Sequence, residues 1–200
     1  PTDENLLLFR RHEIWRYSFA EGMWKKCDVI LNCRNPMYNG VLRTPDGDVF
    51  FGEYGNPGRA GKRIFKSSDN GVTWKCVYTF RPDEIRHIHC LSWDPFEEKI
   101  WVFTGDADHE CKVLCCDREF NTVVVIGQGS QAYRACHVIF SEKTVDWIMD
   151  SPLETVRHVK LDRNTGTISF HSEFAGPVWF AGKLGNRLAI AASEQETGPS

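Results

Sequence analysis

The sequence has no long hydrophobic run and almost no excess of charge of one sign. No apolar stretch approaches the ~20 residues that cross a membrane as a helix, so we expect no membrane span. A formal net charge of −3 over 200 residues gives no electrostatic reason to expect nucleic acid as a partner. The first residues, PTDENLLLF, lack the basic and apolar regions of a signal peptide. These features leave the cellular compartment unknown.

The eight cysteines show no Cys-x-x-Cys spacing of the kind that marks a zinc site. Most of them stand in apolar segments that resemble strands, so we interpret them as buried, reduced thiols. The Asn-x-Ser/Thr acceptor of N-glycosylation is also missing. Both observations lean towards a reducing compartment.

Amphipathic helical periodicity is scarce as well. Short runs of Val, Ile, Phe, Trp and Tyr are instead separated by turn residues about every eight to twelve positions, which is typical of all-β proteins. Explicit turn signals include Pro45-Asp46-Gly47-Asp48 and Asp162-Arg163-Asn164-Thr165-Gly166. The sequence therefore predicts an all-β fold.

One turn pattern recurs with a period of 45 to 49 residues. Its clearest copy spans residues 67–74, and a shorter copy spans residues 18–24. Asp117 follows Asp69 after 48 residues, and Asp162 follows Asp117 after 45 residues. An apolar strand that ends in small or acidic residues recurs in the same phase. Four short strands in each repeat of this length predict the blades of a β-propeller.

We therefore predict one β-propeller domain over residues 1–200, built of four-stranded antiparallel blades. The strands sort into two outer strands in 6–31, three blades at about 38–80, 86–127 and 133–174, and two inner strands in 177–193. The end segments could share a blade and close a four-bladed ring. The loop-like end of the sequence favours the alternative, in which the rest of a larger propeller is a partner. The aromatic residues expected between the sheets are Phe51, Trp74, Trp101 and Trp147.

The clearest copy of the repeat has these residues at its defining positions: Ser67, Asp69, Gly71, Thr73 and Trp74. It resembles the Asp-box, or BNR repeat, of the sialidase-like superfamily. The resemblance implies a propeller in which this turn joins the third and fourth strands of a blade, away from the ligand. Asp69 and Ser67 suit the turn because they can accept hydrogen bonds from its backbone donors. Gly71 can take the positive φ that the turn needs. The Arg-Ile-Pro motif common in sialidases is absent.

In propellers, ligands usually bind where the loops before the first strands and after the second strands meet at the axis. The candidate ligand-binding residues before the inner strands are Tyr38, Asn39, Arg86, His87, His89, Tyr133 and Arg134. The candidate catalytic residues after the second strands are Glu53, Asp106 and Asp150. We expect these side chains to converge on one cavity.

The acidic candidates have two interpretations. Carboxylates from separate blades could be the acid and base of glycoside hydrolysis, or they could end strands and accept hydrogen bonds from loops. Arg86 and Arg134 would suit the carboxylate of an anionic sugar. They could equally pair with Asp106 and Asp150 and brace neighbouring blades.

His87 and His89 are two residues apart on a predicted strand and therefore share a face. With Asp106 they could hold a divalent metal. The interpretation that we favour is no cofactor, with a histidine lining a solvated channel. Trp179 and Tyr54 are candidates for stacking on a sugar, with core packing as the alternative.

Two functions follow from this reading. One is a sialidase-like propeller that binds, or hydrolyses, a carbohydrate or small anionic ligand at the axial face. The other is a propeller without catalytic activity that serves as a protein-interaction scaffold. The sequence does not decide whether the chain is an enzyme.

Overall fold

The computed structural model describes residues 5–29, 31, 33, 35–55, 60–184 and 187–192. This part of the chain forms antiparallel sheets, and its helices are short 3-10 turns: η1 (Tyr38–Gly40), η2 (Asp108–Glu110) and η3 (Gln131–Tyr133). None of the described helices has the length and apolar character needed to cross a membrane.

The sheets use their strands in chain order. The first contains β1 (Asn5–Arg10), β2 (Glu13–Ser18) and β3 (Met23–Lys26). The second contains β4 (Val41–Arg43), β5 (Val49–Gly52), β6 (Arg63–Ser67) and β7 (Lys75–Thr79). The third contains β8 (His87–Asp94), β9 (Lys99–Gly105), β10 (Lys112–Cys116) and β11 (Val123–Gln128). The fourth contains β12 (Val138–Phe140), β13 (Thr144–Ile148), β14 (Val156–Asp162) and β15 (Ile168–Phe174). The last contains β16 (Val178–Leu184) and β17 (Arg187–Ala192).

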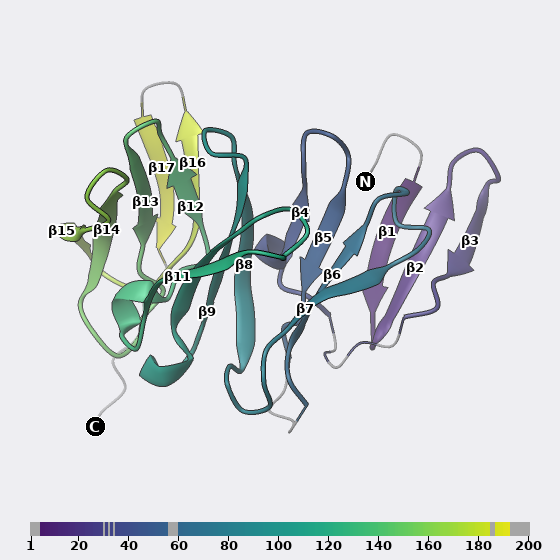
Figure 1. Cartoon of the computed structure of the whole chain (residues 1–200), viewed down its shortest axis with the longest axis horizontal. Helices are drawn as coiled ribbons and strands as arrows, with labels where there is room; N and C mark the ends of the chain where they lie inside the picture. The colour runs from purple at the N-terminus through teal and green to yellow at the C-terminus, as the bar shows by residue number, and fades with distance from the viewer. Residues whose placement is uncertain are drawn as a thin grey trace.

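Successive sheets follow one another across the molecule, from the purple β1–β3 sheet to the green β12–β15 sheet (Figure 1). Each four-stranded sheet is an antiparallel meander, as in a propeller blade. These sheets confirm the predicted fold class. The sheets β1–β3 and β16–β17 are separate in the described residues, so the two end segments do not share a blade there.

The N-terminal segment differs from the prediction, because it forms three strands rather than two. Arg11 and His12 both have positive φ, at 49° and 72°, and they connect β1 to β2 as a tight hairpin turn. Neither residue is the Gly, Asn or Asp that usually signals such a turn. The strand break was therefore not visible in the sequence.

Three apolar clusters fill the spaces between successive sheets. Phe51, Trp101 and Trp147 are buried as predicted, with at most 2% of each residue exposed. Trp74 was predicted to be buried but is only partly so. It lies at the end of the turn, directly before β7, where its ring packs edge-on against Phe9 and Phe51.

The repeated turns join the third and fourth strands of three sheets. In the first, the Asp69 carboxylate accepts a hydrogen bond from the Thr73 N–H at 2.9 Å, and Gly71 has a φ of 86°. The Asp117 and Asp162 carboxylates likewise accept hydrogen bonds from backbone N–H groups two to five residues ahead. These local bonds fix the end of the sheets that lies away from the candidate site.

Candidate functional site

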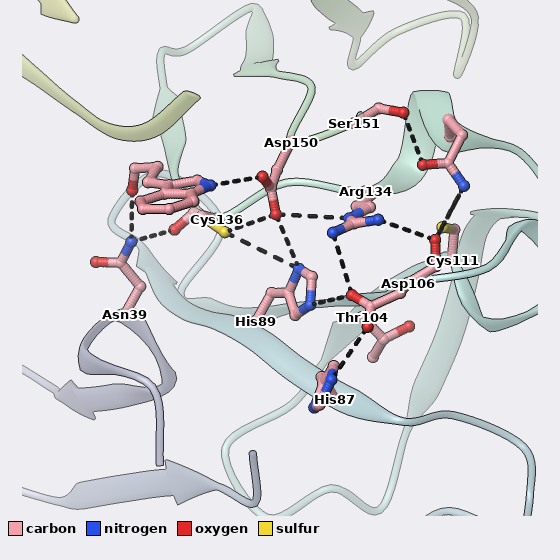
Figure 2. A network of polar contacts seen from close by, with 12 residues as sticks. Asn39, His87, His89, Thr104, Asp106, Cys111, Arg134, Cys136, Asp150 and Ser151 are labelled. Atoms are coloured by element: carbon pink, nitrogen blue, oxygen red, sulfur yellow. Dashed lines mark hydrogen bonds and ion pairs between the residues drawn. The ribbon is translucent and has the colours of Figure 1, made fainter. Parts of the chain in front are cut away.

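The opposite end of the sheets gathers charged side chains around Asp106, which directly follows β9. The Asp106 carboxylate lies 3.1 Å from His87 Nε2, 3.3 Å from His89 Nε2 and 3.2 Å from an Arg134 guanidinium nitrogen. Arg86 is a more distant partner, at 3.6 Å. The structure therefore brings five of the predicted residues into one polar network. Figure 2 shows His87, His89 and Arg134 around Asp106.

A β-bulge sets the position of His89. Ile88 pairs with Thr104 and Cys90 pairs with Phe103, so His89 is the extra residue on β8. Bulges of this kind redirect a side chain near the end of a strand. Opposite it, a Cβ at Gly105 would lie 3.2 Å from the His89 ring and 3.1 Å from Arg134, so a glycine there allows both side chains to approach.

Asp150, which follows β13, is the second centre of the network. Its Oδ2 accepts a hydrogen bond from the Cys136 thiol at 3.2 Å and lies 3.5 Å from both His89 Nδ1 and Arg134 Nε. Its Oδ1 accepts a hydrogen bond from the Trp179 indole N–H at 2.9 Å. Figure 2 shows His89 between Asp106 and Asp150, so one imidazole ring links the two carboxylates.

The network shifts the titration of two of its members in opposite directions. Burial alone would raise the pKa of Asp106, but the close imidazole rings of His87 and His89 and the charge of Arg134 outweigh it and lower that pKa. Burial strongly raises the pKa of the Cys136 thiol, and the negative charge of Asp150 adds to the effect. Asp106 is therefore ionised as a carboxylate. Cys136 is protonated as a thiol unless a cation binds beside it.

Buried hydrogen bonds behind the network hold its loops in place. The Gln131 side-chain amide donates to the Asp106 carbonyl at 3.0 Å, and its oxygen accepts from the Ser151 hydroxyl at 2.8 Å. The Glu110 carboxylate accepts from the Asp106 backbone N–H at 3.0 Å. The loops after β9 and β13 are thus tied to each other through η3, which keeps Asp106 and Asp150 at a fixed separation.

A cavity of about 400 Å³ opens beside Asp150. Charged and aromatic side chains share its wall: His89, Arg134, Asp150, Tyr38, Tyr54 and Trp179. Tyr38 and Trp179 are 58% and 53% exposed, so solvent reaches the aromatic side of the cavity. They are held together, because the Tyr38 hydroxyl donates a hydrogen bond to the Trp179 carbonyl.

Glu53 lies apart from this cavity, although its sequence position matches those of Asp106 and Asp150. Its residue is fully buried, and its carboxylate accepts hydrogen bonds from the Arg63 backbone N–H at 2.9 Å and from the Arg63 guanidinium at 2.8 Å and 3.2 Å. This pairing within one sheet makes Glu53 a structural anchor, contrary to the catalytic role expected for it.

Of the other predicted residues, His87 and Asn39 contact residues of the cavity wall. Arg86 and Tyr133 are not among the residues that line the cavity. His87 stacks on Tyr54 with ring centroids 4.1 Å apart. Asn39 donates a hydrogen bond to the Trp179 carbonyl at 3.1 Å and another to the Cys136 carbonyl. Arg86 lines a separate hollow of about 260 Å³. Tyr133 packs over Gly127, where a Cβ would come within 2.1 Å of its ring.

Cys136 is the main contact residue that the sequence analysis missed, because it was interpreted only as a buried thiol. A signal was present, since Cys136 is two residues after Arg134 and stands in a predicted inner strand. Two extended residues at that spacing share a face. Trp179 was named only as a stacking candidate, and its hydrogen bond to Asp150 depends on the packing of β16 against β13, which the sequence does not show.

No protein-family model and no curated protein matches this chain. Solved structures do. A gluconolactonase from Xanthomonas campestris is 13% identical with a TM-score of 0.61, covering 95% of this chain and 66% of that one. TolB from Acinetobacter baumannii is 13% identical with a TM-score of 0.54, covering 95% and 49%. A chain of a nidogen/laminin complex is 14% identical with a TM-score of 0.55, covering 86% and 59%.

These likenesses define the class of fold. The chain is a β-propeller protein, and it spans between about half and two thirds of the length of the structures that it resembles. At such low identity the likeness concerns the fold alone. The sialidase-like resemblance of the Asp69 turn therefore remains a sequence-based interpretation.

Proposed function

We propose that this propeller binds a carbohydrate in the cavity lined by His89, Arg134, Asp150 and Trp179. The observation that carries the proposal is the pairing of half-exposed aromatic rings with buried polar groups in one hollow. Sugar rings present apolar C–H faces and a rim of hydroxyls. They are recognised by aromatic platforms combined with a few fixed hydrogen-bonding groups.

The charges of the cavity favour neutral sugars. Arg134 already contacts Asp106 at 3.2 Å and Asp150 at 3.5 Å, so its charge is balanced without a ligand. We therefore expect neutral oligosaccharides to bind at least as well as acidic ones. The contact of Arg134 with Asp106 joins neighbouring blades, and it supports the pairing that the sequence left open as one of two alternatives.

Binding rather than hydrolysis is the function we propose. Asp150 is the one carboxylate among the described residues that line the cavity, whereas glycoside hydrolysis usually needs two that flank the scissile bond. From the sialidase-like resemblance, the proposal therefore takes only the propeller fold and a face that binds a sugar. It takes no catalytic residues from it.

The test is calorimetric titration of the chain with a panel of neutral and acidic oligosaccharides. Replacing the platform in Trp179→Ala should weaken binding up to about tenfold, because aromatic contacts contribute up to about 1.5 kcal/mol. Trp24→Ala is a matched control, since Trp24 is 43% exposed and lies on β3, in another sheet.

Two results would count against the proposal. If no oligosaccharide of the panel binds, the protein-interaction scaffold becomes the better interpretation. If Trp24→Ala weakens binding as much as Trp179→Ala does, the sugar does not occupy this cavity.

A further inference from the structure

We propose that His89, Cys136 and Asp150 form a binding site for a zinc-like divalent metal ion, with one coordination position open to the cavity. All three residues are buried, and one potential ligand atom from each lies within 4.8 Å of the other two. They come from three separate segments: β8, the loop before β12 and the loop after β13. The inference stands on these atoms and does not require that a sugar binds.

The distances between the three atoms fit a tetrahedral ion. Ligand atoms at the usual zinc bond lengths stand about 3.3–3.6 Å apart. Asp150 Oδ2 is 3.5 Å from His89 Nδ1 and 3.2 Å from Cys136 Sγ, while Cys136 Sγ is 3.9 Å from His89 Nδ1. An ion could therefore be held with side-chain shifts of a few tenths of an ångström.

The surrounding contacts orient these atoms as they do in known metal sites. His89 Nε2 faces the Asp106 carboxylate at 3.3 Å, which leaves Nδ1 as the lone-pair nitrogen towards Cys136 and Asp150. A carboxylate behind a ligating histidine is the common arrangement in proteins. The Trp179 indole holds Asp150 Oδ1 at 2.9 Å, which leaves Oδ2 as the atom that faces the ion.

The charges also balance. A thiolate at Cys136 and a carboxylate at Asp150 would neutralise a divalent ion, with His89 neutral. The nearby Arg134 does not depend on Asp150, because its guanidinium contacts the Asp106 carboxylate at 3.2 Å and the Asp106 carbonyl at 3.1 Å. The mixture of imidazole, thiolate and carboxylate favours zinc over magnesium or calcium, which prefer oxygen ligands alone.

This set differs from the His87, His89 and Asp106 set considered from the sequence. In the structure, His87 and His89 of β8 both contact the Asp106 carboxylate. The Cys136 thiolate is a better zinc ligand than that carboxylate oxygen. Because His89 and Asp150 also line the cavity, the fourth position faces it. On the proposed function, that position would meet a sugar hydroxyl.

The test is direct metal binding, without a sugar. The chain is stripped with a chelator and titrated with Co²⁺ and, in competition with a chromogenic chelator, with Zn²⁺. We expect one equivalent to bind with a thiolate-to-cobalt charge-transfer band. Cys136→Ser should abolish the band and weaken Zn²⁺ binding more than about a hundredfold, since loss of a ligand exceeds the 10–100-fold effect of an outer partner. Cys116→Ser, at an equally buried cysteine of β10, should leave both unchanged.

Asp106→Asn separates a metal site from a merely polar cluster. It should weaken Zn²⁺ binding about 10–100-fold while the thiolate band persists, because Asp106 orients His89 without touching the ion. The proposal is overturned if the unaltered chain gives no thiolate band with one equivalent of Co²⁺. It is equally overturned if Cys136→Ser, folded by circular dichroism, binds Zn²⁺ as tightly as the unaltered chain.

Discussion

At one end of the sheets, the carboxylates of Asp69, Asp117 and Asp162 accept hydrogen bonds from backbone N–H groups within five residues of themselves. At the other end, Asp106 also contacts Arg134, which precedes the next sheet, and Asp150 contacts His89 of β8 and Trp179 of β16. The same residue type thus closes a turn in one place and joins blades in the other. Local partners fix the fold, whereas partners from several sheets create a site whose geometry depends on how the blades pack.

Glu53 shows that position alone does not decide between these roles. It follows the second strand of its sheet, as Asp106 and Asp150 follow theirs, yet its carboxylate is paired with Arg63 ten residues away in the same sheet. A partner within the blade saturates the carboxylate and leaves it nothing to offer a ligand. The comparison therefore predicts that Glu53 matters for stability and Asp150 for binding.

The largest effect should come from breaking the Glu53 pair. Arg63→Met keeps the aliphatic stem but leaves a fully buried carboxylate without its guanidinium, which typically costs about 3–5 kcal/mol. Urea unfolding measures the loss. Arg157→Met is the control: it removes an exposed ion pair with Glu173, and this loss should lower the stability by less than about 1 kcal/mol. Equal losses in the two variants would show that Glu53 is not a buried anchor.

A smaller effect is expected at the turn end. Asp69→Ala removes the acceptor of the Thr73 N–H and the Thr73 hydroxyl, so unfolding should become easier by about 1–2 kcal/mol. Asp69→Asn keeps one acceptor oxygen and should lose less. Cobalt binding should be unchanged in both, because this turn is at the far end of the sheet. A variant that folds normally yet loses the cobalt band would break the separation of the two ends.

The same contrast explains what the sequence could predict. The Asp69, Asp117 and Asp162 turns were visible because all of their partners lie a few residues away. The phase of the repeat also predicted that His87, His89, Asp106, Arg134 and Asp150 would converge, although their role in binding remains a prediction. The Glu53–Arg63 pair and the Cys136 contact depend on strand register and blade packing. The Arg11-His12 hairpin was hidden because non-glycine residues rarely take positive φ.

The smallest effect should be a change in acid sensitivity at Asp117. Burial alone would raise the pKa of Asp117, but hydrogen bonds from the backbone N–H groups of Thr122, Asn121 and Glu119 outweigh it and lower the pKa. A carboxylate with a lowered pKa in the folded state stabilises the fold fully above its unfolded pKa of about 3.9. That stabilisation is lost as the pH falls through the folded pKa. As the pH falls from neutral to below the unfolded pKa of about 3.9, the unaltered chain should therefore lose more stability than Asp117→Asn.

The difference should stay below about 1 kcal/mol, because Asp117 is partly exposed and solvent screens it. Urea midpoints at neutral pH and near pH 3, just below the unfolded pKa of about 3.9, measure it. Glu142→Gln, at an exposed carboxylate outside the three turns, should keep the pH dependence of the unaltered chain. If Asp117→Asn shows that same dependence, the turn-end carboxylates do not stabilise the fold through their charge. The comparison between the two ends would then rest on geometry alone.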